Sequence, residues 1–216
     1  MAFFGAHIVL AADADPVVDE FAQVRPGAPE RMIVAPRKTV DRYWQTVAPR
    51  HSRPRLVRES QPLLAVDRKS LRGDSKGIAV RRARIDEWET VARNSAAMIR
   101  EELGYDPRAG SDEFDPGVRA AIERGAWWVG ESGVELCFYC SEGPYSAHTL
   151  QLQGIWTPPK LRRKAYATRA LFAICDALLE RHPTLSLYVN DFNAPALALY
   201  ATLGFVQVGE LSTLLF

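Results

Sequence analysis

Three basic residues followed by small ones stand where an apolar segment gives way to a helical pattern. The segment reads WTPPKLRRKAYATRAL (156–171), with the basic run 162–164 ahead of Ala165 and Ala167. The beginning of a helix offers unpaired N–H groups and a partial positive charge, both of which favour a phosphate group. Small residues let an anion approach the backbone, and basic side chains add charge-assisted hydrogen bonds. The pattern predicts a phosphate site; the alternative is an ordinary helix start with solvated basic residues.

A second pattern lies in NDFNAPALALYATLGF (190–205), which directly follows the apolar run LSLYV. Asn193 and Tyr200 are separated by two helical turns, so they fall on one side of the helix, roughly 10 Å apart along its axis. The helix is expected to stop at Gly204. This spacing suits an elongated ligand.

The strand pattern TLQLQGIW (149–156) ends just before Pro158 and Pro159. Proline cannot donate to a sheet ladder, so strand pairing must stop there. If the neighbouring strand 184–190 diverges at that point, the first strand keeps unpaired backbone groups on which an extended, amide-bearing ligand can dock. Coenzyme A has this shape, because a pyrophosphate is followed by a pantetheine arm with two amides and then a thiol.

Hydrophobic periodicity predicts the elements that position these residues. From residue 78 onward the predicted order is strand, helix, helix, three strands, helix, strand, helix and two strands, which indicates a mixed α/β class rather than a simple doubly wound sheet. The predicted strands are 78–83, 126–130, 134–140, 149–156, 184–190, 205–211 and 212–216, and the predicted helices are 85–104, 111–125, 160–182 and the one that Asn193 opens.

The first 66 residues repeat the later half of that order of elements, without its sequence and without its first strands and helices. The predicted strands are 6–12, 30–36, 54–60 and 62–67, the last two as a pair, and the predicted helices are 15–23 and 39–48. A polar linker, DRKSLRGDSKG (67–77), follows. We interpret residues 1–76 as a partial, degenerate copy of the region 77–216; the alternative is an unrelated N-terminal extension.

The totals argue against several classes of protein. Lysine and arginine number 27 against 26 acidic residues, so the net charge of +1 gives no general attraction to nucleic acid. No apolar run approaches the roughly 18 residues that a membrane helix needs, and the N-terminus is a poor signal peptide. Three cysteines favour a reducing cytoplasm. Cys137 and Cys140 lie on a predicted strand where their thiols diverge, and no second pair exists, so no metal site is expected.

The motifs together resemble the GNAT superfamily of N-acetyltransferases. The resemblance rests on R-x-x-A-x-A at 162–167, N-x6-Y at 193–200 and L-G-F at 203–205, and it covers about residues 78 to 216. More narrowly, EELGYDP (101–107), WTPP and the preceding half-copy resemble a subfamily with a degenerate GNAT-like N-terminal half. The resemblance implies a central mixed sheet, partly splayed and flanked by helices, preceded by a partial GNAT-like half.

The resemblance also implies roles for individual residues. Backbone groups of 154–156 would hold the pantetheine arm, and backbone amides of 163–168 would hold the pyrophosphate together with the Arg162 side chain. Asn193 would bond the arm from its other side. Tyr200 would protonate the departing thiolate, and the alternative is that Tyr200 is a core aromatic residue. The implied coenzyme-binding residues are Gly154, Ile155, Trp156, Arg162, Arg163, Lys164, Ala165, Tyr166, Ala167, Thr168, Asn193 and Tyr200.

The sequence departs from the family pattern at two places. Position 165 usually holds glycine; Ala165 adds a methyl group, and we expect a helical backbone there that keeps the amide contacts but weakens binding. The second departure is the general base, because the two central strands offer Leu150, Gln151 and Tyr188 where many relatives carry glutamate. Candidates elsewhere are Glu135, Glu101, Glu102 and His148, acting directly or through water, with Glu135 retained as the predicted base. The amine could also arrive already deprotonated.

The implied activity is an acyl-CoA-dependent N-acyltransferase, which moves an acetyl group from acetyl-CoA to a primary amine by direct attack. The alternatives are a non-catalytic acyl-CoA-binding or regulatory module and a scaffold without a coenzyme. The acceptor would lie over Met98, Glu101, Glu102, Tyr105 and the loop 141–148, where the acidic residues would favour a cationic amine. Small amines, antibiotics, peptide N-termini and lysine side chains stay open as acceptors, as does a homodimer.

Overall fold

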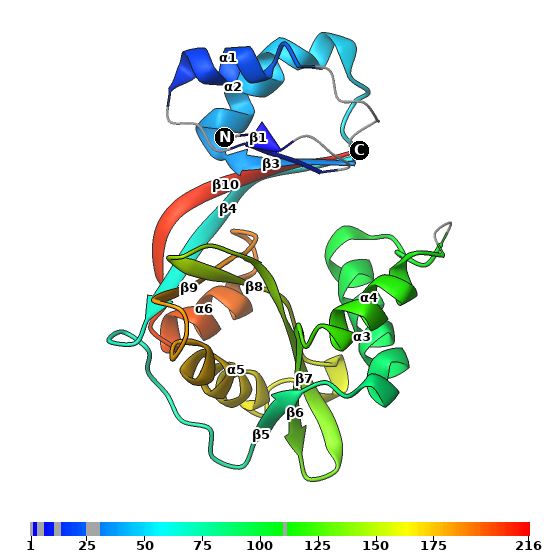
Figure 1. Ribbon diagram of the computed structural model, residues 1–216, viewed down its shortest axis with the longest axis vertical. Coiled ribbons are helices and arrows are strands. Elements are labelled where there is room, and N and C mark those ends of the chain that lie inside the picture. Colours follow the sequence, from blue (N-terminus) through cyan, green and yellow to red (C-terminus); the bar gives the residue numbers. More distant parts are fainter. Residues whose placement is uncertain (1, 4–6, 11–13, 25–30, 110–111) are drawn as a thin grey trace. The chain divides into compact units, whose positions relative to one another are not determined.

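The structure is a computed structural model that describes residues 2–3, 7–10, 14–24, 31–109 and 112–216 (Figure 1). It divides into two compact units, each built from segments distant in the sequence. Unit 1 consists of Met1–Leu64, Tyr188–Leu197 and Gln207–Phe216, and unit 2 consists of Ala65–Leu187 and Ala198–Val206. These units are composed differently from the predicted regions 1–76 and 77–216, whose functional division stays a prediction.

Unit 2 is built on a mixed sheet whose strands follow the order β9-β8-β7-β6-β5. Neighbouring strands from β5 to β8 pair antiparallel, whereas β8 and β9 pair parallel. The strands are β5 Ala79–Arg82, β6 Trp127–Ser132, β7 Glu135–Tyr145, β8 Thr149–Trp156 and β9 Thr184–Tyr188.

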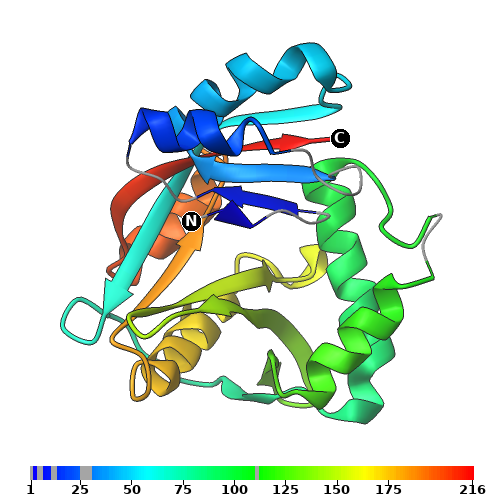
Figure 2. The ribbon, with the colours of Figure 1, turned by 45° about the horizontal axis from the view of Figure 1, so that its top comes forward.

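Helices cover both faces of this sheet. The helices α3 (Trp88–Leu103) and α4 (Phe114–Glu123) lie together on one face, and α5 (Tyr166–Leu178) lies on the other, as both views show (Figures 1 and 2). On α3 the buried residues are Val91, Ala92, Ser95 and Ala96, the spacing of an amphipathic helix. The helix ends at Gly104, which has a φ of 75°, as the glycine stop in the sequence predicted.

Unit 1 is built on a second group of strands in the order β1-β2-β3-β10-β4. The parallel pair β2–β3 is followed by the antiparallel pair β3–β10, so the C-terminal strand completes the N-terminal sheet. The elements are β1 Ala2–Phe3, β2 His7–Leu10, α1 Asp15–Phe21, β3 Met32–Pro36, α2 Arg37–Val47, β4 Leu56–Asp67 and β10 Val206–Leu215. Its core joins strand residues such as Ile8 and Ile33 to helix residues such as Val40 and Tyr43. Parts of the predicted strands 6–12 and 30–36 lie outside the described residues.

Two predictions that divide a segment into separate strands were wrong. The strands predicted at 54–60 and 62–67 are replaced by the single strand β4, Leu56–Asp67. The strand continues through Pro62 because its carbonyl still accepts a hydrogen bond from the Val189 N–H at 3.2 Å. The strands predicted at 205–211 and 212–216 are likewise replaced by one strand, β10, Val206–Leu215. No turn interrupts it at Ser212 and Thr213, because both hydroxyls find acceptors on β4. Ser212 donates to the Arg58 carbonyl, and Thr213 donates to the Gln61 side chain.

Two boundaries in unit 2 also differ from the prediction. The loop expected after residue 140 is strand as far as Tyr145, so β7 runs longer than its apolar centre. The helix expected from residue 160 begins only at Tyr166, after a 3₁₀ turn at Pro159–Leu161. The segment between that turn and Tyr166 is the basic run of the predicted phosphate site, and its backbone conformation decides what the site can bind.

Candidate functional site

The strands β8 and β9 are paired only along the first part of β8. Among the described residues their register joins Thr149 to Thr184, Leu150 to Leu185 and Gln151 to Ser186. Beyond that point β8 continues to Trp156 without a pairing to β9. The predicted divergence is therefore confirmed, and it leaves backbone N–H and C=O groups of 152–156 available to a ligand on the β9 side.

A β-bulge lies within this diverging part of β8. Tyr139 pairs with Trp156 and Ser141 pairs with Gln153, so β8 carries one residue more than β7 between the two pairs. Gly154 occupies the bulge with a φ of 61°, and a Cβ there would meet the Trp127 ring at 3.1 Å. The bulge turns the backbone of 154–156 away from a regular ladder. The sequence held a signal for it, because an isolated glycine inside a strand pattern indicates a bulge.

The loop before α5 adopts a conformation that was not expected of its residues. Arg163 has a φ of 64° and Ala165 a φ of 59°, and these are the only non-glycine residues with positive φ in the part of the chain that the structure describes. The expectation of a helical Ala165 was therefore wrong. Ala165 is the left-handed N-cap of α5, and the helix follows from Tyr166.

This loop has the features of an anion cradle. Residues with positive φ alternate with ordinary ones over 163–165, which directs successive N–H groups toward one point. Ala165 provides no side-chain cap, and the first turn of α5 holds no acidic residue. The partial positive charge of the helix start is therefore left for an external anion. The geometry fits the diphosphate that the sequence pattern predicted.

The Arg162 side chain lies with α3 and β8 in this structure. Its Nε donates to the Thr157 carbonyl at 3.0 Å, and its guanidinium carbon lies 4.5 Å from the centre of the Trp156 ring. An ion pair of 3.0 Å joins it to Glu101 on α3. Its expected role at the diphosphate stays a prediction. Arg163 and Lys164, which belong to the loop itself, are exposed.

Tyr200 is a buried residue of α6 (Ala194–Thr202), with 6% of its surface exposed. Burial raises the pKa of its phenol well above 10, and the charges of Cys140, Glu102 and Cys175 raise it further. The ring packs against Phe205 with 5.8 Å between centroids. Tyr200 therefore keeps its proton at neutral pH, as its predicted role requires, while also serving as a core aromatic residue.

Asn193 and Gly204, which flank α6, have structural roles. The Asn193 side-chain oxygen accepts a hydrogen bond from the Ala196 N–H at 3.3 Å, so Asn193 caps the start of α6. Its predicted bond to the pantetheine arm stays a prediction. Gly204 has a φ of 90°, and a Cβ there would lie 1.9 Å from the Ser70 carbonyl oxygen. Glycine is therefore required where the L-G-F turn packs on the segment that precedes β5.

A profile described as the acetyltransferase (GNAT) family matches residues 85–205 of the 216. The chain belongs to this family. Residues 1–91 match a profile described as a domain of unknown function, DUF4081, which fits a separate N-terminal half. A search of the curated proteins finds no match.

Solved structures support the GNAT-like fold. A Drosophila protein matches at 12% identity, 100% coverage of this chain and 73% of its own, with a TM-score of 0.71. A GNAT-family acetyltransferase from Colwellia psychrerythraea matches at 11% identity, coverage of 94% and 72%, and a TM-score of 0.62. A GCN5-related N-acetyltransferase from Kribbella flavida matches at 14% identity, coverage of 85% and 66%, and a TM-score of 0.57. These likenesses confirm the mixed α/β class and the fold.

The residues predicted to face the acceptor lie at the C-terminal end of α3 in this GNAT-family protein. Met98 is half-buried against the core that includes Tyr139 and Trp156. Glu101 and Glu102 are exposed, and Tyr105 follows directly after the Gly104 stop. Glu102 is the carboxylate whose charge reaches Tyr200, where it raises the pKa of the phenol.

The other candidate bases are placed differently. Glu135 is exposed at the start of β7, where it pairs with Ser132 beside the hairpin turn. His148 is exposed in the turn before β8, and its carbonyl accepts a hydrogen bond from Thr184. This hydrogen bond places His148 at the paired end of β8 and β9. Glu135 stays a prediction as the base.

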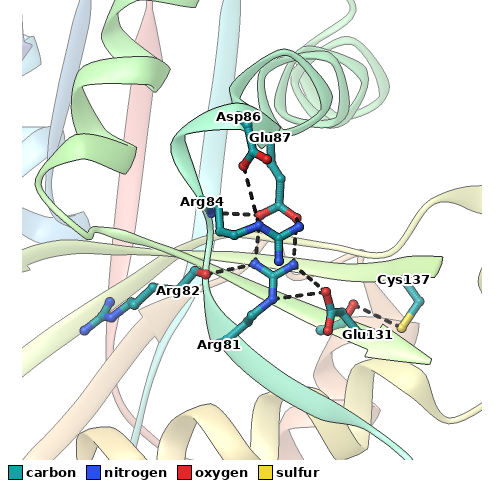
Figure 3. Close-up of polar contacts among 8 residues, drawn as sticks. Arg81, Arg82, Arg84, Asp86, Glu87, Glu131 and Cys137 are labelled. Atoms are coloured by element: carbon teal, nitrogen blue, oxygen red, sulfur yellow. Dashed lines mark hydrogen bonds and ion pairs between the residues drawn. The ribbon is translucent and has the colours of Figure 1, made fainter. Parts of the chain in front are cut away.

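A network of ion pairs fixes the start of α3 (Figure 3). Arg81 on β5 donates two hydrogen bonds to Glu87, of 2.6 and 2.8 Å, and its Nε donates to Glu131 on β6 at 3.0 Å. Hydrogen bonds from Arg81, together with those from Arg84, lower the pKa of Glu87, whose side chain is 11% exposed. These contacts anchor the helix that carries Met98, Glu101 and Glu102, which were predicted to face the acceptor.

Two further observations concern the described residues as a whole. No three His, Cys, Asp or Glu side chains gather there in a metal-binding arrangement. Within the described ranges, none of the helices combines the length and the apolar character needed to cross a membrane.

Proposed function

We propose that the protein is an acyl-CoA-dependent N-acyltransferase that transfers an acetyl group from acetyl-CoA to a primary amine by direct attack. The observation that carries the proposal is the divergence of β8 and β9 beyond Gln151, next to the left-handed loop before α5. The opened strand suits a long amide-bearing arm, and the loop suits its diphosphate. Family membership supports the same reaction class.

The backbone conformation supports specific binding roles. The bulged groups of 154–156 would hold the pantetheine arm, and the N–H groups of 163–168 would hold the diphosphate. Bound acetyl-CoA would supply an acetyl group activated as a thioester. Backbone N–H groups near Ile155 and Trp156 would polarise the thioester carbonyl.

Tyr200 would give its phenolic proton to the departing sulfur. A phenol in water has a pKa near 10 and a thiol near 8.5, so this transfer is slightly uphill when both groups are solvated. Burial disfavours both anions, and it would raise the proton affinity of a sulfur beside the buried Tyr200 as well. The phenol and the sulfur are then better matched as a proton donor and acceptor.

The attacking amine must be neutral, because an ammonium with a pKa near 10.4 has no free electron pair. Glu135 is the predicted acceptor of that proton, directly or through water, and Glu101, Glu102 and His148 are the alternatives. Replacing the carboxylate that acts as the base with glutamine should steepen the dependence of turnover on pH, because the enzyme would then rely on amine deprotonated in solution.

Calorimetry with acetyl-CoA, followed by a thiol-release assay with a panel of primary amines, tests the proposal. We expect binding, and thiol release that depends on the amine. Absence of heat at millimolar acetyl-CoA would overturn it.

A non-catalytic acyl-CoA-binding module is the second candidate. Two observations favour it: the methyl group of Ala165 at the cradle, and the neutral residues on the central strands. Tyr200→Phe separates the two functions, because an enzyme should lose turnover while keeping coenzyme affinity.

A further inference from the structure

The Arg162 guanidinium occupies a site that is suited to a cation. The Trp156 ring lies beneath it at 4.5 Å, the Glu101 carboxylate pairs with it at 3.0 Å, and the Thr157 carbonyl accepts from its Nε at 3.0 Å. An aromatic face, a carboxylate and a carbonyl oxygen together are the groups that proteins use to bind organic cations. We refer to Trp156, Thr157 and Glu101 as the cation subsite.

The cation subsite also holds polar atoms without partners. The Trp156 indole N–H and the Thr157 hydroxyl oxygen are both buried, and neither has a hydrogen-bond partner among the residues that the structure describes. Trp156 as a whole is 6% exposed. Buried polar groups in native proteins are nearly always hydrogen-bonded. The Thr157 hydroxyl oxygen can accept a hydrogen bond from a bound cation, whereas the indole N–H is a donor and needs an acceptor from elsewhere.

Arg162 is held there by contacts that are easily exchanged. The side chains of Arg162 and Glu101 are 38% and 49% exposed, and half-exposed ion pairs contribute little to stability. Arg162 also directly precedes the anion cradle at 163–165. A diphosphate in that cradle carries more charge than one carboxylate and accepts arginine hydrogen bonds in a matched geometry, so it competes well for the guanidinium.

We propose that Trp156, Thr157 and Glu101 bind a positively charged group of the acceptor, and that Arg162 fills this subsite until coenzyme binding draws it away. The inference rests on the proposed function, because it assigns the diphosphate to the cradle beside Arg162. It also narrows the acceptor class. A site that stabilises a cation opposes loss of its proton, so the bound group is not the attacking amine. The acceptor is a primary amine that carries a second positive charge, such as a diamine or an aminoalkylguanidine.

Calorimetry with N-ethylguanidinium as the probe tests the subsite without turnover. The probe should bind about tenfold more tightly to protein saturated with free CoA than to protein alone. Equal affinity in the two states overturns the proposal. If CoA itself gives no heat, the proposed function fails, and the variant below still tests the subsite without any coenzyme.

Arg162→Gln should bind the probe without CoA, because the resident cation is gone. Adding Glu101→Gln to that variant should weaken binding about tenfold, whereas adding Glu89→Gln, an exposed glutamate at the start of α3, should leave it unchanged. These exposed residues can be exchanged without loss of the fold. Failure of Arg162→Gln to bind, or equal effects of the two glutamine exchanges, refutes the subsite.

A kinetic comparison tests the acceptor class. Diamines with three to six methylene groups should include one whose kcat/KM exceeds that of the monoamine of equal length by about tenfold. Glu101→Gln should remove that preference, whereas Glu89→Gln should leave the kinetics of both substrates unchanged. A monoamine that is as good a substrate as every diamine contradicts the inferred acceptor class.

Discussion

Replacement of Ala165 by glycine should stabilise the protein, although glycine usually weakens a helix. Ala165 has a φ of 59° and a ψ of 11°, a left-handed conformation in which its methyl group crowds the following carbonyl. That crowding costs about 1–2 kcal/mol for a residue with a Cβ. Glycine removes it, but the freer unfolded chain opposes folding by about 0.4–1 kcal/mol. The free energy of unfolding should therefore rise by about 0.5–1 kcal/mol, which raises Tm by about 1–4 °C at this chain length.

Ala167→Gly is the matched control, because it makes the same chemical change two residues later, inside α5. A helical alanine gains nothing from glycine, so this variant should lose about 0.5–1 kcal/mol. Urea unfolding of the two variants measures both effects. Calorimetry with acetyl-CoA should also show tighter binding for Ala165→Gly, since no methyl group faces the cradle. If both variants are destabilised equally, Ala165 does not have a left-handed conformation, and the loop 163–165 does not form the anion cradle.

Three further variants test other parts of the site. Tyr200→Phe should lower kcat by about 10²-fold with the Kd for acetyl-CoA unchanged, and an unchanged kcat would exclude proton donation by Tyr200. Gly204→Ala should cost about 2–5 kcal/mol in urea unfolding, because its Cβ would lie 1.9 Å from a carbonyl oxygen at a φ of 90°, whereas Gly117→Ala, which meets no atom within 4 Å, should be neutral or stabilising. The lowered pKa of Glu87 means that its carboxylate stabilises the fold above the ordinary value near 4.5 and that this contribution is lost as pH falls through the lowered pKa. Glu87→Gln should therefore flatten the loss of stability between pH 7 and 3, and parallel curves for the two proteins would contradict the assignment.

The elements that the sequence predicted well are those with local signals at both ends. Residues 149–156 form β8 with the predicted bounds, because alternating apolar residues are bounded by a turn on one side and by Pro158 on the other. The end of α3 at Gly104 could also be predicted from the sequence, since a left-handed cap there favours glycine. Local chemistry determines such boundaries, and a sequence displays local chemistry directly.

The incorrect predictions concern features that depend on distant partners. Two strands, 54–60 and 62–67, were predicted where β4 runs through Pro62, whose carbonyl accepts a hydrogen bond from the N–H of Val189, far along the chain. A separate strand was predicted to begin at Ser212. In the structure β10 continues through Ser212 and Thr213, and β4 supplies the acceptors for their hydroxyls. Neither contact can be predicted from a short window of sequence, because its two partners are far apart along the chain.

The candidate site shows the difference between a residue's identity and its conformation. At position 165 the family's usual glycine is replaced, yet the backbone keeps the left-handed conformation that a glycine would adopt. At position 162 the family's arginine is present, yet its side chain lies on Trp156 and Glu101. The proposed diphosphate cradle therefore depends on backbone geometry that alanine can adopt at a modest energetic cost. The charge of Arg162 meanwhile pairs with Glu101 on α3, and in our proposal coenzyme binding would draw Arg162 away from the cation subsite.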